Sequence, residues 1–185
     1  MKGFLIGVGV AVVVVALGFV GIYNGIITKH ETVTAKWAQV GNQLQRRNDL
    51  IPNLVNSVKG YAAHEKTVFE DVTKARSQWA NASTVGDKVN AASGMDSALA
   101  RLIAVAENYP QLKADQTFLR LMDELSGTEN RIAVERMRYN DAVRDFNVTV
   151  RRFPANAVAG IFGYKAANEY FKAEEQAKSV PEVKF

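Results

Sequence analysis

The sequence predicts an all-α protein with one N-terminal transmembrane helix followed by an antiparallel helical bundle of about four helices, two of them long. Three observations lead to this fold class. Residues 3–27 carry no charged side chain, apolar residues recur every seven positions in two later stretches, and only 4 of the 185 residues are proline. Helices with an apolar stripe bury it against one another, so we expect one bundle domain over residues 29–178.

The uncharged segment GFLIGVGVAVVVVALGFVGIYNGII (Gly3 to Ile27) is long enough to cross a bilayer, because a helix rises ~1.5 Å per residue and the hydrocarbon core is ~30 Å thick. The alternative is a cleaved signal peptide, whose apolar stretch is shorter and ends at a small-residue cleavage site. Ala16-Leu17-Gly18 comes nearest to such a site, but cleavage there would leave an apolar remnant. We therefore interpret residues 1–28 as a retained, single-pass anchor.

Charges beside the anchor do not orient it. Lys2 and the amino terminus flank one end and Lys29 and Lys36 the other, so the positive-inside rule is close to a tie and the side of the soluble domain stays open. Residues 28–185 carry a net charge of +3, because only Lys2 precedes them. So mild an excess does not require nucleic acid as a partner, and it is compatible with a bilayer surface containing anionic lipid.

The first long helix is predicted over residues 33–79. Two series of positions seven apart run through it and are apolar or aromatic except at Arg47 and Glu65, which is the a/d pattern of a coiled coil. Proline usually breaks or kinks a helix, but the register continues through Pro52. We therefore expect one helix kinked near residues 48–52, with two separate helices as the alternative.

The second long helix is predicted from Phe118 to Phe153, where six apolar or aromatic residues lie seven positions apart. It should end before Pro154, because the residue preceding a proline disfavours helical geometry. Residues 126–129, Ser-Gly-Thr-Glu, resemble a capping box and are a local argument for a new helix start. The unbroken register favours one continuous helix. The residues expected to face the core are Trp37, Leu44, Ile51, Leu54, Val58, Phe118, Leu125, Ile132, Tyr139 and Phe146.

Between the long helices we expect a small-polar linker over residues 81–94 and a shorter helix from about Met95 to Glu107, with Ser93 capping its first turn. Tyr109-Pro110 should end that helix. After Pro154 the sequence predicts a glycine-bearing loop, then a last short helix, and a flexible tail over residues 179–185.

Polar residues lie within or beside both apolar stripes. Arg47 occupies an a/d position, and burying a charge is costly unless it is paired, so an acid such as Glu129 or Asp141 is the expected partner. The first interpretation is a structural network that fixes the register of the helices, and the second is a recognition groove for a peptide or partner helix. The candidate residues are Arg46, Arg47, Asn48, Asp49, Asn53, Glu129, Asn130, Arg131, Tyr139, Asn140, Asp141 and Asn147.

The anchor carries small residues on one face, and such faces let transmembrane helices approach closely. Glycine is common in transmembrane helices in any case, so an ordinary compositional bias is the competing interpretation. The face predicts self-association or contact with another membrane helix. Its residues are Gly3, Gly7, Ala11, Gly18, Gly21 and Gly25.

No catalytic, cofactor-binding or metal-binding residues are predicted. His64-Glu65 is half of an H-E-x-x-H zinc motif, but Val68 stands where the second histidine is needed, and His30 is the only other histidine. The absence of cysteine excludes disulfides, thiolate nucleophiles and zinc-thiolate sites. No G-x-S-x-G elbow or phosphate-binding glycine loop occurs in the soluble part.

Four segments together resemble the LemA family, bacterial proteins with one N-terminal transmembrane helix and a helical-bundle domain. They occur in the family's order and cover most of the soluble part, although the linker near residues 81–95 and the tail depart from the family's loose pattern there. The resemblance implies no established enzymatic activity. The segments are QLQRRNDLIPNLVNSVKGYAAHE (Gln43 to Glu65), VAENYPQLKADQTFLRLMDEL (Val105 to Leu125), TENRIAVERMRYNDAVRDFN (Thr128 to Asn147) and RFP (Arg152 to Pro154).

Two classes of function follow from these observations. The preferred one is a scaffold or interaction module anchored in the bacterial cytoplasmic (inner) membrane, with the lipid bilayer and other proteins, including further copies of itself, as partners. The alternative is an accessory or regulatory subunit of a membrane enzyme such as a protease, with the chemistry on another chain. A hydrolase is a distant third, since the sequence lacks a nucleophile or metal site for it.

Overall fold

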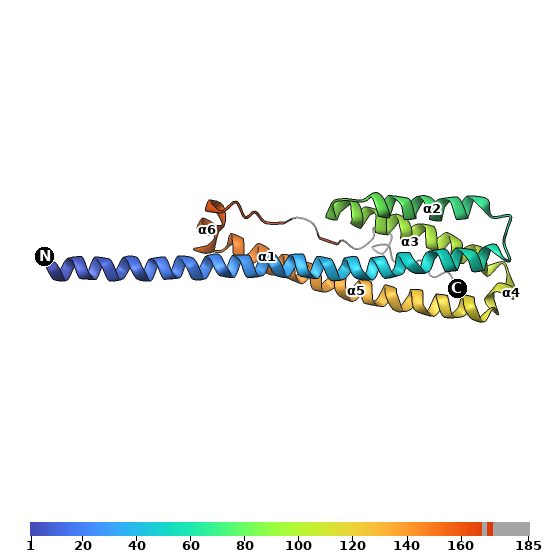
Figure 1. Ribbon diagram of the computed structural model, residues 1–185, viewed down its shortest axis with the longest axis horizontal. Coiled ribbons are helices and arrows are strands. Elements are labelled where there is room, and N and C mark those ends of the chain that lie inside the picture. The colour runs from blue at the N-terminus through green and yellow to red at the C-terminus, as the bar shows by residue number, and fades with distance from the viewer. Residues whose placement is uncertain (168–169, 172–185) are drawn as a thin grey trace, which may run out of the picture. The chain divides into compact units, whose positions relative to one another are not determined.

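The computed structural model describes residues 1–167, 170 and 171, and this part of the chain consists of helices and loops without a strand, which confirms the all-α class (Figure 1). The chain forms two compact units, Met1–Gln39 with Met137–Tyr170 and Val40–Arg136 with Phe171. The expected anchor over residues 1–28 and bundle over residues 29–178 stay predictions, because compactness does not locate a membrane boundary. The expected tail lies outside the described residues.

Helix α1 (Lys2–Lys59) is continuous and contains Pro52, so two helices separated at this proline were the wrong alternative. The prediction of one helix to residue 79 was also wrong, because the chain turns over residues 60–65 before α2 (Lys66–Asn81). Gly60 follows the last residue of α1, and glycine ends helices readily. Val58 before the turn and Val72 after it are both buried and lie two heptads apart, so counting by sevens crosses the turn without a visible change of phase.

Helix α3 (Val85–Glu107) begins about ten residues before the predicted start, and only three residues separate it from α2. Its N-cap is Thr84, whose hydroxyl accepts a hydrogen bond from the backbone N–H of Asp87 at 3.1 Å. The Asp87 carboxylate accepts the N–H of Thr84 in return at 3.4 Å. This capping box replaces the predicted cap at Ser93, whose hydroxyl donates to the carbonyl of Val89 inside the helix.

Four helical segments form an up-down bundle within the second unit. The C-terminal part of α1, then α2, α3 and the first part of α5 (Gln116–Arg151) follow one another through short connections, the last including α4 (Pro110–Lys113). Their buried residues form one core, to which Leu54, Phe69, Leu102 and Leu125 each contribute from a different helix. In Figure 1, α2 and α3 lie side by side and run in opposite directions. The predicted antiparallel bundle of about four helices is therefore present.

Helix α5 is unbroken through residues 126–129, so the local capping-box signal there was rightly overruled by the register. Thr128 is fully buried, and its hydroxyl donates to the carbonyl of Leu125 at 2.7 Å. The helix ends at Arg151, two residues before the predicted Phe153. The hydrogen bond that Thr128 donates to the preceding turn satisfies its buried hydroxyl inside the helix.

After α5 a short helix occupies the first part of the segment that was predicted to be a glycine-bearing loop. The short helix α6 (Ala155–Ile161) begins directly after Pro154, and the glycine-bearing loop follows it, with Gly163 at a φ of 75° that favours glycine. Val158 and Ala159 of α6 pack with Ile26 of α1 and with Phe146 and Val150 of α5 in the core of the first unit. The rest of the expected last helix lies mostly outside the described residues.

Nine of the ten predicted core residues are buried, and the tenth, Trp37, is half-buried with its ring centroid 5.5 Å from that of Tyr139. The heptad count found these positions because each helix buries one stripe, whatever happens at its ends.

Candidate functional site

The most unusual buried side chain of the second unit is Arg47. It occupies the apolar stripe of α1 between Leu44 and Ile51, one turn to either side, and only 7% of it is exposed. Heptad position forces the guanidinium into the bundle, because both neighbours on its stripe are buried in the core. A charge in this place requires partners from facing helices.

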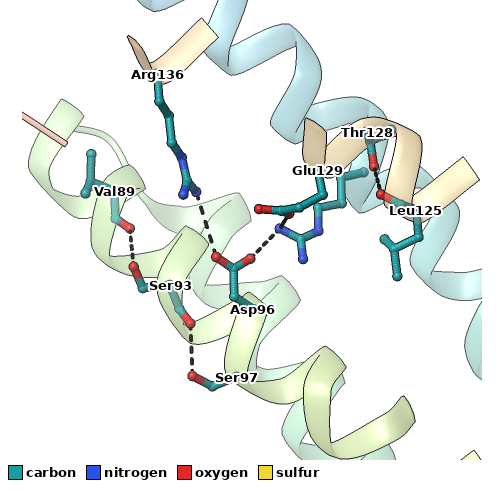
Figure 2. A network of polar contacts seen from close by, with 9 residues as sticks. Val89, Ser93, Asp96, Ser97, Leu125, Thr128, Glu129 and Arg136 are labelled. Carbon is teal, nitrogen blue, oxygen red and sulfur yellow. Dashed lines mark hydrogen bonds and ion pairs between the residues drawn. The ribbon is translucent and has the colours of Figure 1, made fainter. Parts of the chain in front are cut away.

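Those partners come from two other helices. The guanidinium of Arg47 forms an ion pair with Asp96 of α3, and its Nη1 lies 2.8 Å from the carboxylate of Glu129 of α5. Arg136, two turns further along α5, approaches the other oxygen of Asp96 at 3.8 Å. Figure 2 shows the Asp96 carboxylate between Arg136 and the guanidinium that also faces Glu129. We call these four residues the Arg47 cluster.

The charges of the Arg47 cluster balance, but its hydrogen bonding is incomplete. Arg47 and Glu129 are close enough to form an ion pair, but Oε2 of Glu129 makes no aligned hydrogen bond. Nε of Arg47, Nε of Arg136 and Oδ1 of Asn48 are also buried without a hydrogen-bond partner in the described part of the chain. A cavity of about 10 Å³ adjoins Arg47, Asn48 and Asp96, which is at the lower limit for one water molecule.

The structure brings together only part of the predicted polar set. Arg47, Asn48 and Glu129 meet in the second unit, and the expected pairing of Arg47 with Glu129 is present. Tyr139, Asn140, Asp141 and Asn147 belong to the first unit. The predicted residues that lie exposed are Arg46, Asp49, Asn53, Asn130, Arg131 and Asp141.

Asp141, the other expected partner of Arg47, pairs instead with Arg144 at 3.2 Å on the surface of α5. Asn147 is buried and fastens the chain after α6: its Nδ2 donates to the carbonyl of Ala167 at 2.7 Å and to the hydroxyl of Tyr170 at 2.9 Å, and its Oδ1 accepts the N–H of Ala167 at 2.8 Å. These hydrogen bonds join α5 to residues 167 and 170 within the first unit.

The sequence prediction missed Asp96 and Arg136. Asp96 lies one turn from both Ala92 and Leu99, which are buried on α3, so an acid beside an apolar stripe was a usable signal. Asp96 was overlooked because the helix was expected to start only at Met95, so the buried Ala92 was not counted as part of its stripe. Arg136 lies four residues after the buried Ile132, and its long side chain reaches back toward the preceding turn.

Three exposed polar residues of α1 share one face. Arg46, Asp49 and Asn53 are spaced by three and four residues, and Asp49 accepts a hydrogen bond from Gln45 at 2.8 Å. We call them the α1 polar face. A second surface feature is a cleft of about 640 Å³ between α2 and α3, lined by polar side chains that include Lys74, Gln78 and Asn90.

No group of three or more His, Cys, Asp or Glu side chains suited to a metal ion occurs among the residues that the structure describes. His64 is exposed in the turn between α1 and α2. His30 lies on α1 in the first unit, with its ring near those of Phe146 and Tyr164 at 5.6 and 5.5 Å. His30 belongs to the first unit and His64 to the second.

The apolar N-terminal stretch of α1 is the one described segment long and apolar enough to cross a membrane. Its large side chains are exposed from Phe4 to Val20, whereas Ile22, Tyr23 and Ile26 pack against α5 and α6. A Cβ added at Gly21 or Gly25 would meet no atom within 4 Å, and the same holds for Gly3, Gly7 and Gly18. Within the part of the chain that the structure describes, these five glycines of the predicted small-residue face therefore pack against no other segment.

These features define a class, an all-helical bundle whose first helix begins in an exposed apolar segment. The sequence pattern of the LemA family matches residues 36–185, and the chain belongs to this family. It is similar to magnetosome protein MamQ 2 of Paramagnetospirillum magneticum, with 31% identity over 86% of this chain and 67% of the relative.

Two further relatives are similar. Magnetosome protein MamQ of Magnetospirillum gryphiswaldense is 29% identical, again over 86% of this chain and 67% of the relative. Protein LemA of Metamycoplasma hominis is 27% identical over 76% of this chain and 65% of its own length.

Proposed function

We propose that the protein is a scaffold or interaction module of the bacterial cytoplasmic membrane, held there by residues 1–28 and without catalysis of its own. The observation that carries this proposal is the exposure of the apolar stretch. No residue of its most apolar 18-residue window is buried by the other residues that the structure describes. A core helix of a water-soluble protein would be covered, and so large an exposed apolar surface needs lipid or another apolar partner.

The α1 polar face is the proposed contact for a protein partner. Arg46, Asp49 and Asn53 are exposed on the helix that also carries the apolar stretch. The ion pairs of the Arg47 cluster join α1, α3 and α5 within the bundle that carries this face. A rigid support of this kind reduces the entropy lost when a surface binds.

The experiment that tests the proposal is photocrosslinking in native membranes. A photoreactive amino acid replaces Asn53 on the α1 polar face, Gln78 in the α2–α3 cleft, or Asp123 on the exposed surface of α5 as the matched control. We expect a defined product from Asn53 and none from Asp123. Crosslinking from Gln78 alone would move the contact to the cleft, and the absence of products at every site would contradict the interaction proposal.

Mass spectrometry of the same membranes tests the anchor. A chain that retains its N-terminal residues and resists carbonate extraction supports the proposal, whereas a chain that begins near Phe19 and extracts with carbonate contradicts it.

The same crosslinked product separates a scaffold from an accessory subunit. If deletion of the protein changes the turnover of the crosslinked enzyme at constant enzyme level, the regulatory function is the better description. If deletion changes only the assembly or position of the partner, the scaffold stands.

A further inference from the structure

The segment 153–162, which carries α6, exposes apolar side chains outside the anchor. Phe153 is 82% exposed, Ile161 70% and Phe162 47%. Among the described residues after residue 20, Phe153 and Ile161 are the two most exposed large apolar side chains. Single exposed apolar residues are ordinary, but three in one short segment call for an apolar environment.

This segment is fixed beside the end of the apolar stretch of α1. The ring of Phe162 lies 4.3 Å from that of Tyr23 and 6.0 Å from that of Phe19. Val158 and Ala159, on the other side of α6, are buried against Ile26 in the core of the first unit. The buried side therefore holds α6 on α1, and Phe162 adjoins residues that would lie at the edge of the hydrocarbon.

Basic side chains flank the segment. Arg151 and Arg152 precede it and Lys165 follows it, and all three are exposed without an ion pair to any described residue. Aromatic residues and cations are enriched where membrane-bound segments meet the headgroups, because the rings favour the interface and the charges face anionic lipid.

We propose that segment 153–162 inserts into the interfacial region of the same bilayer that α1 crosses, as a second membrane contact beside the anchor. This inference rests on the proposed anchoring. The occupant is lipid and not a protein, because the exposed apolar surface of the segment continues through Phe162 and Phe19 into the stretch proposed to span the membrane. The contact would fix the first unit at a defined depth in the membrane.

The test uses the full chain in vesicles of phosphatidylcholine and phosphatidylglycerol. The sequence contains no cysteine, so single substitutions accept one environment-sensitive fluorophore each. Phe153→Cys and Ile161→Cys report on the segment, Val12→Cys on the anchor, and Val134→Cys, an exposed apolar position of the second unit, is the matched control. Both segment positions are highly exposed, so the label leaves the core intact, and circular dichroism checks the helix content.

We expect labels at positions 153 and 161 to emit at shorter wavelength than the label at 134. Lipid-borne doxyl groups should quench them, and aqueous iodide should quench them several-fold more weakly than at 134. Iodide quenching at 153 and 161 as strong as at 134, with position 12 in lipid, would overturn the inference and leave the anchor standing. Protection from both quenchers would overturn it too, since protein would then cover the segment. Iodide access at position 12 would instead refute the proposed anchoring.

Discussion

Arg47 of α1 and Asp96 of α3 form an ion pair inside the bundle, 49 residues apart in the sequence. The pair joins the first and third helices of the second unit, and Glu129 and Arg136 extend it to α5. Replacing a buried ion pair with apolar residues is often neutral, whereas removing one partner leaves an uncompensated charge. The energetic effect of the cluster should therefore depend on which charges are removed together.

The first prediction concerns this coupling. Asp96→Ala should destabilise the domain by up to about 3 kcal/mol, less than a fully buried pair would give, because the side chains of Asp96 and Glu129 remain 21% and 46% exposed. The double variant Arg47→Met with Asp96→Ala should lose less stability than Asp96→Ala alone. Urea unfolding of the chain without residues 1–28 measures a double-mutant cycle, and purely additive effects would show that the two residues act separately.

The second prediction concerns the core. Leu125 and Ile132 of α5 are 6% and 0% exposed, so replacement of either by alanine should cost about 2 to 5 kcal/mol through lost burial and the cavity left behind. Leu119, on the same helix, is 41% exposed and serves as the control, with an expected change under about 0.5 kcal/mol for Leu119→Ala. Equal losses at the buried and the exposed positions in urea unfolding would refute the predicted packing.

The third prediction concerns the start of α3. Thr84→Ala removes the hydroxyl that accepts the N–H of Asp87 and should destabilise the domain by about 0.5 to 2 kcal/mol. Amide exchange should accelerate first in residues 85–88. Ser83→Ala, one position before the cap, is the matched control and should leave both measurements unchanged. An equal effect of the two substitutions would mean that the capping box does not hold the first turn.

The capping box of Thr84 and Asp87 is a feature that was not predicted from the sequence, whereas the apolar stripes were predicted. The stripes of α1 and α5 were readable, because Ile51, Leu125 and Ile132 repeat at heptad spacing whatever the chain does elsewhere. The start of α3 was not found, because its first turns are rich in small and polar residues and the box uses Asp87 where glutamate or glutamine is typical.

The ends of helices and the partners of charges depend on other elements, and periodicity does not reveal them. The turn at Gly60 left the heptad count intact, so α1 and α2 were predicted as one helix. The pairing of Arg47 with Glu129 could be predicted because both residues lie within or beside apolar stripes that the heptad count identifies. Asp96 required a complete α3, and the packing of α6 on Ile26 depends on a contact distant in sequence.

The fourth prediction is a pH dependence at the start of α5. The backbone N–H of Phe118, above all, holds the pKa of Asp115 below its ordinary value against the opposing effect of desolvation, with help from the N–H of Thr117 and the hydroxyl of Tyr61. A carboxylate with a lowered folded-state pKa stabilises the fold above its unfolded pKa of about 3.9, and this contribution is lost as the pH falls through the folded value.

Asp115→Asn should therefore be less stable than the parent at neutral pH, and the difference should shrink below about pH 4. Asp123→Asn replaces an exposed carboxylate of the same helix and is the control. Urea unfolding across the acid range measures both. A stability difference for Asp115→Asn that is constant with pH would show that the charge of Asp115 does not contribute.

The last prediction concerns the small-residue face of the anchor. Gly21 and Gly25 are exposed, and an added Cβ at either meets no atom within 4 Å, so leucine at both positions should leave the fold of a single chain unchanged. Close approach of another transmembrane helix would be blocked, and crosslinked or detergent-solubilised complexes should become smaller while insertion is retained. Val13→Leu with Val20→Leu adds bulk at other exposed positions and is the control. Complexes of unchanged size in the glycine variant would attribute these glycines to the ordinary composition of transmembrane helices.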